Sequence, residues 1–109
     1  MAHDEGVAER LRDVYRDVPN VDERRMFGGV AFMVNGHMSC GVVDESLMVR
    51  VGPDRYDAAM KHPHAREMDF TGQPLRGFVF VEPEGFESDD DLATWVTWSL
   101  EFVQALPPK

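Results

Sequence analysis

The dipeptide Asn35-Gly36 constrains this chain most strongly, because it stands between two apolar runs. Asparagine and glycine both accept the positive φ angles that a two-residue β-hairpin turn requires. Residues 25–34 therefore predict one strand and residues 37–43 a second. Asp44-Glu45 then separates the second run from residues 46–51, which predict a third strand. The sequence thus predicts a β-meander at the centre of the fold.

Two-residue turns also determine which side chains share a face of the meander. One predicted face is apolar throughout and needs a layer of helices, and it holds Phe27, Gly29, Ala31, Met33, Met38, Cys40, Val42, Leu47, Val49 and Val51. The other predicted face is mixed, with apolar residues along its first strand, and it holds Met26, Gly28, Val30, Phe32, Val34, His37, Ser39, Gly41, Val43, Ser46, Met48 and Arg50.

One helix is predicted before the meander in the sequence, and two helices and two strands are predicted after it. Apolar residues recur at helical spacing over 4–18 and again over 92–106, where Ser88 is a suitable N-cap for the second of these helices. A short helix is predicted around 56–60, and strands over 67–71 and 77–82. The predicted order is α-β-β-β-α-β-β-α. We expect an α+β fold, a single two-layer domain over 1–109 with a mainly antiparallel five-stranded sheet.

The formal net charge of −9 argues against direct binding to nucleic acids. Seven acidic residues follow Val81, and Lys109 is the only basic residue in that part of the chain. Phosphate groups repel such a surface, and no stripe of basic residues with interleaved aromatic side chains offsets it. Direct binding to DNA or RNA is therefore disfavoured.

The single cysteine, Cys40, excludes a disulfide within the chain and is expected to behave as a small buried hydrophobic residue. The sequence has no signal segment at its N-terminus and no apolar run long enough to cross a membrane. We therefore expect a cytoplasmic protein that does not associate with membranes.

No set of residues predicts catalysis, a metal site or a cofactor. His62 and His64 flank Pro63, but their spacing does not match a known zinc motif. Gly28-Gly29 lies within a predicted strand and is not followed by a helix N-terminus that could hold a phosphate. Glycines in such a place more often mark a bend or the close approach of another backbone.

Two binding surfaces can be predicted from the pattern alone. The mixed face of the meander has no fourth helix to cover it, so we expect a homodimer through Met26, Val30, Phe32, Val34 and Met48. The alternative is that the short helix around 56–60 covers this face. The second surface is a small-ligand pocket between sheet and helices, lined by Phe70, Phe78 and Trp95.

Several motifs resemble the TfoX N-terminal domain family. They are Arg25-Met26-Phe27-Gly28-Gly29 at the first hairpin, Leu47-Met-Val-Arg50, Phe80-Val-Glu-Pro83, and an acidic cap before Leu92-Ala-Thr-Trp95-Val96. The resemblance implies an α-β(3)-α-β(2)-α fold and a role connected with the regulation of competence genes. It carries over no catalytic residues.

These observations predict a non-enzymatic regulatory or adaptor domain that acts through a protein partner. A small-ligand-binding module is the alternative.

Overall fold

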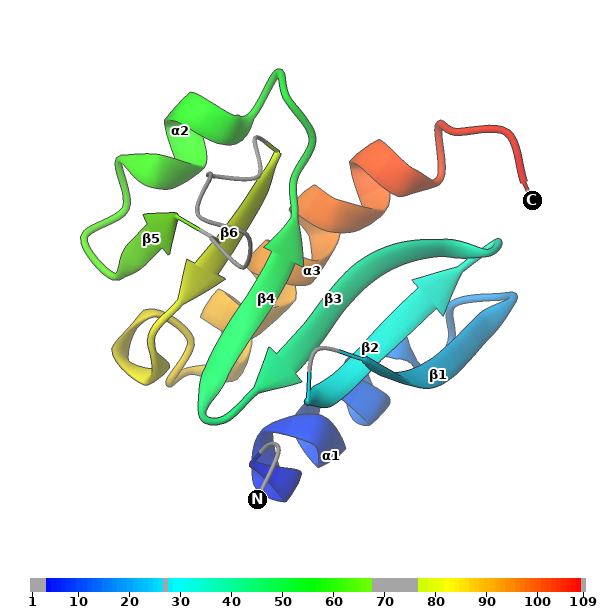
Figure 1. Cartoon of the computed structure of the whole chain (residues 1–109), viewed down its shortest axis with the longest axis horizontal. Coiled ribbons are helices and arrows are strands. Elements are labelled where there is room, and N and C mark those ends of the chain that lie inside the picture. The colour runs from blue at the N-terminus through cyan, green and yellow to red at the C-terminus, as the bar shows by residue number, and fades with distance from the viewer. Residues whose placement is uncertain (1–3, 27, 68–76, 109) are drawn as a thin grey trace.

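The computed structural model describes residues 4–26, 28–67 and 77–108, and Figure 1 shows how their helices and strands are arranged. Three α-helices and six strands lie within these residues. Their order is α1 (Glu5–Tyr15), β1 (Val21–Met26), β2 (Gly29–Val34), β3 (His37–Val43), β4 (Ser46–Arg50), α2 (Tyr56–Met60), β5 (Ala65–Glu67), β6 (Phe78–Val81), the 3-10 turn η1 (Pro83–Gly85) and α3 (Asp89–Val103).

The strands of the described residues form one sheet in the order β1-β2-β3-β4-β6-β5, and every neighbouring pair is antiparallel. The predicted α+β class and antiparallel sheet are confirmed. The strand predicted over 77–82 is observed as β6, which lies between β4 and β5. The strand predicted over 67–71 shares only Glu67 with β5, and residues 68–71 lie outside the described residues.

The predicted number of five strands is wrong, because the sheet has six. The predicted strand 25–34 is two strands: Met26 pairs with Gly29, so the chain reverses direction between them. Gly28 lies at this reversal with a φ of +74°, which glycine adopts without strain. The additional strand is β1. Its sequence, Val-Asp-Glu-Arg-Arg-Met, lacks the apolar alternation that predicts a strand.

A shift in the pairing of β2 with β3 overturns the predicted faces of the meander. Val34 pairs with His37, as the two-residue turn requires, but Phe32 pairs with Cys40 instead of Ser39. Ser39 is therefore the extra residue of a β-bulge. Beyond the bulge, the apolar side chains of β2 change partners and join the face that carries Cys40.

The helices cover one face of the resulting sheet. In Figure 1, α1 and α3 lie behind the strands, and all three helices contribute to the cluster of buried residues on that side. The strand residues of this cluster are Val30, Phe32, Val34, Cys40, Val42, Leu47, Val49, Val79 and Val81. The predicted burial beneath helices is thus confirmed for Cys40, Val42, Leu47 and Val49.

On the opposite face, the described residues form an apolar cluster from strand residues alone. We call this face the open face because no described helix contributes to this cluster. Its buried members are Ala31, Met33, Met48 and Phe80, and Met38, Val43 and Phe78 pack against them. The prediction that Ala31, Met33 and Met38 lie beneath the helices is wrong, because the bulge moves β2 by one residue relative to β3.

The first helix is capped at its start and packs on the sheet at its end. The Asp4 carboxylate caps α1 by accepting hydrogen bonds from the amides of Gly6 and Val7, at 2.8 and 3.3 Å. At its other end the Tyr15 ring stacks on Phe32, with ring centroids 5.1 Å apart. The predicted apolar stripe of α1 is therefore the surface that packs on β2 and β3.

The segment before α3 joins the two long helices. Ser88 caps α3 as predicted, since its hydroxyl accepts a hydrogen bond from the Asp91 amide at 3.0 Å. The Arg10 guanidinium, on α1, donates to the carbonyl oxygens of Phe86 and Glu87 at 2.8 and 3.1 Å. Trp95 Nε1 donates to the carbonyl of Gly85 at 3.0 Å, so the segment is held from both helices.

We expect Phe32→Ala to lower the free energy of unfolding by about 3–5 kcal/mol, because it leaves a cavity beneath Tyr15. Phe32 is 1% exposed and lies in the helix-covered core. Urea denaturation measures the loss, and Val43→Ala, a half-buried position on the open face, is the control with a smaller effect. A loss below about 1 kcal/mol for Phe32→Ala would contradict this placement.

Candidate functional site

The family-like motif at residues 25–29 forms the reversal between β1 and β2. Arg25 is exposed near the end of β1, while the side chain of Met26 and all of Phe27 lie outside the described residues. A Cβ atom added to Gly29 would collide with the carbonyl of Val42, so glycine permits β2 to lie close to β3. The predicted role of these glycines, a bend and a close approach, is confirmed.

The strand before this turn, β1, lies at an outer edge of the sheet. Within the described residues, β2 is the only strand that pairs with β1, and Figure 1 shows β1 as the outermost strand at that side. Asp22, Glu23, Arg24 and Arg25 are all exposed. A hollow of about 160 Å³ lies between this strand and α1, lined by Glu5, Arg12, Glu23, Arg24, Arg25 and Val30.

Arg12 gathers acidic side chains at this hollow. Its Nε and Nη2 atoms donate to the Glu23 carboxylate at 2.9 and 3.0 Å, and its Nη1 donates to Glu5 at 2.8 Å and also to Glu9. These hydrogen bonds, to Glu23 first and then to Glu5, hold the pKa of Arg12 above its ordinary value. The cluster therefore compensates the charge of Glu23 and fastens β1 to α1.

Three hydroxyl groups form a buried chain between α1, the bulge and α3. The Tyr15 hydroxyl lies 2.6 Å from Ser39 Oγ, which lies 2.7 Å from Ser99 Oγ. Both serines are fully buried. Beside them burial raises the pKa of the Cys40 thiol to about 11, so Cys40 is an unreactive core residue as predicted.

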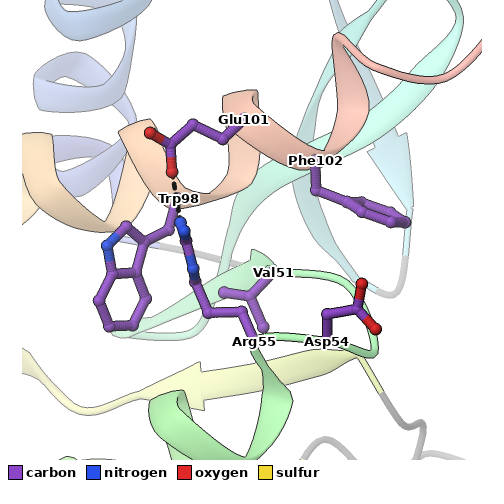
Figure 2. Close-up of a pocket in the computed structure, with 6 residues that line it drawn as sticks. All are labelled: Val51, Asp54, Arg55, Trp98, Glu101 and Phe102. Atoms are coloured by element: carbon purple, nitrogen blue, oxygen red, sulfur yellow. Dashed lines mark hydrogen bonds and ion pairs between the residues drawn. The ribbon is translucent and has the colours of Figure 1, made fainter.

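A second hollow, of about 150 Å³, lies between the segment after β4 and α3. Figure 2 shows its lining residues, Val51, Asp54, Arg55, Trp98, Glu101 and Phe102. Arg55 pairs with Glu101, and its guanidinium lies 5.0 Å from the centroid of the Trp98 ring. Arg55, the cationic residue of this hollow, is thus already paired with Glu101. The volume of the hollow is below the roughly 300–1,000 Å³ of typical small-molecule sites.

A comparison against family models gives a match over most of the chain. The model described as TfoX N-terminal domain matches residues 13–103. The chain belongs to this family. A search of curated proteins finds no match. Family membership points to a regulatory role connected with competence, and the family is not a known enzyme family.

The residues predicted as the interface of the TfoX N-terminal domain do not form one surface. The structure places Val30, Phe32 and Val34 in the core beneath the helices. Met48 lies on the open face and is fully buried. These residues therefore cannot form the predicted contact, because the bulge turns the apolar side of β2 inward. Self-association itself stays a prediction.

The predicted ligand pocket is not assembled either. Phe78 packs on the open face, whereas Trp95 lies in the helix-covered core, so the sheet separates them. Phe70 lies outside the described residues.

His62 contacts both Trp95 and the backbone of His64. The His62 ring meets Trp95 edge-on at 5.2 Å, and its Nδ1 accepts a hydrogen bond from the amide of His64 at 3.2 Å. No group of three possible metal-binding side chains is found among the described residues. Among the helices of the described residues, none is long and apolar enough to span a membrane.

The edge strand β1 is the feature that sequence reasoning missed. Its signal was present in the order of charges, two acids followed by two arginines directly before the glycine turn. Because the run lacks apolar alternation, it predicts no strand before residue 25. Read as a strand, it places charges on both faces of an open sheet edge.

We expect the domain to lose stability at alkaline pH through Cys40. The thiol's pKa is raised to about 11 in the folded protein, against about 8.5 in an unfolded chain. Its contribution is therefore fully present below about pH 8.5 and is lost as the pH rises through about 11, by about 3–4 kcal/mol at about 1.36 kcal/mol per pKa unit.

Urea denaturation across this pH range, compared between the wild type and Cys40→Ala, measures the contribution. The difference between the two proteins should shrink as the pH rises. Burial also raises the pKa of Tyr15 in both proteins, while Cys40 adds to that rise only in the wild type. A difference that does not change with pH would contradict the buried thiol.

Proposed function

We propose that this domain is a non-enzymatic regulatory or adaptor module of the cytoplasm, acting in competence or transcription regulation through protein contacts. The observation that carries the proposal is the exposed, charged edge strand β1 beside the glycine turn of the family-like motif. An exposed edge offers unpaired backbone groups to another protein chain, and its side chains select the partner.

The charge distribution favours a protein partner over nucleic acid. The net charge is −9, and exposed Asp89, Asp90 and Asp91 lie at the start of α3. Of the arginines near β1, Arg12 is already bound to acids. Arg24 and Arg25 alone offer little attraction to a phosphate backbone.

Expression of the domain in a naturally competent bacterium should change transcript levels of its DNA-uptake genes. The double variant Arg24→Glu/Arg25→Glu should lose this effect, because it reverses the charge of the edge. Arg16→Glu/Lys61→Glu is the matched control, since it changes the net charge equally at exposed positions away from β1. Transcript sequencing is the measurement, and an unchanged response in the edge variant would count against the edge.

The purified domain should not retard duplex DNA in a mobility-shift experiment at moderate salt. Its acidic surface repels phosphates near neutral pH. Tight binding that weakens as salt is added would overturn a mechanism based on protein contacts alone.

A further inference from the structure

We propose that the domain forms a twofold-symmetric homodimer in which β1 pairs antiparallel with β1 of a second copy. This inference rests on the proposed function and names the partner of the same edge. The two sheets would then continue into each other across the dimer axis.

The backbone of β1 is suited to accept a strand. Its pairing with β2 runs without a shift from Val21 opposite Val34 to Met26 opposite Gly29. Next to this ladder the Asn35 amide donates to the Asn20 carbonyl at 3.1 Å. Because antiparallel ladders alternate, the backbone groups of the odd-numbered residues, Val21, Glu23 and Arg25, point away from β2 to the outer edge.

The order of charges selects the direction of pairing. Asp22-Glu23 is followed by Arg24-Arg25, so antiparallel pairing of two copies places the acids of each beside the bases of the other. Parallel pairing would place like charges opposite each other, which is unfavourable. Within the described residues, Asp22, Arg24 and Arg25 have no ion-pair partner in the monomer.

Symmetry and face together restrict the register. A twofold axis perpendicular to the sheet keeps each face of the sheet on the same side in both copies. The numbers of two residues that lie opposite each other are therefore equal or differ by an even number. With Glu23 on the axis, Asp22 lies opposite Arg24 of the second copy, and this pair occurs twice. Arg25 then lies diagonal to Glu23 of the second copy, within reach of a long side chain.

The central pair of glutamates is acceptable in this register because each already binds Arg12 of its own chain, at 2.9 and 3.0 Å. The neighbouring register, with Arg24 on the axis, places two arginines opposite each other with no such internal compensation. We therefore assign the axis to Glu23.

The contact is small. Six residues of strand span roughly 20 Å, which is less than a standard protein interface provides. We expect a dimer with a dissociation constant in the micromolar range that weakens as salt screens the exposed charges.

Sedimentation of the purified protein at tens to hundreds of micromolar and low salt should show a monomer–dimer equilibrium. Arg24→Glu/Arg25→Glu should raise the dissociation constant by about tenfold or more, since like charges across an interface are costly. Arg16→Glu/Lys61→Glu should dimerise as the wild type does, and circular dichroism verifies that each variant is folded. Glu23 is left unchanged because it holds α1 through Arg12.

Two cysteine variants test the register. A mixture of Asp22→Cys and Arg24→Cys should form a disulfide-linked dimer on mild oxidation, because non-hydrogen-bonded antiparallel partners lie at disulfide distance. Each variant alone should crosslink far less, and Cys40 is buried and does not interfere.

A monomeric wild type, or an edge variant that dimerises normally, would overturn the proposal. Crosslinking of each cysteine variant alone as efficiently as of the mixture would overturn the assigned register. A monomeric wild type whose edge variant still abolishes the transcript response would leave the proposed function standing with a different partner.

Discussion

The bulge at Ser39 decides which side chains of this sheet the helices cover. The Asn35-Gly36 turn requires Val34 to lie opposite His37, and a regular ladder would then place Phe32 opposite Ser39. One extra residue in β3 brings Phe32 opposite Cys40, so the largest side chain of β2 faces Tyr15. Because strand side chains alternate, one residue of shift exchanges the two faces of a strand.

The bulge leaves a polar side chain in the core, and the helices satisfy it. Ser39 points to the helix side, where its hydroxyl lies between those of Tyr15 and Ser99. A buried hydroxyl without a partner would cost about 1–3 kcal/mol, so this chain supports the bulge as well as joining α1 to α3. Packing of the first helix therefore depends on a local irregularity of β3.

The features predicted correctly from sequence were those with a local cause. The turn at Asn35-Gly36 needs positive φ, which both residues have. The cap at Ser88 needs only its own hydroxyl and the amide of Asp91. The faces of β2 could not be predicted, because a bulge depends on tertiary packing against Tyr15 and leaves no mark in the sequence of β3. The same holds for the pocket, since Phe78 and Trp95 are separated by a sheet whose strand order the sequence does not state.

The edge strand was missed for a different reason. Strand prediction looks for apolar residues at every second position, and β1 has charged residues at its four central positions. Charges on an exposed edge are a common protection against indiscriminate strand pairing, because most foreign edges would bury them without a partner.

The protection is selective when acids and bases occur in blocks. A chain with two acids followed by two bases repels a parallel copy of itself and attracts an antiparallel one, so the same residues that prevent aggregation can specify one partner. Here the selection is reinforced from within, because Arg12 compensates Glu23 and leaves Asp22, Arg24 and Arg25 as the charges that a partner meets. An edge built in this way resists apolar strands and long polyanions alike.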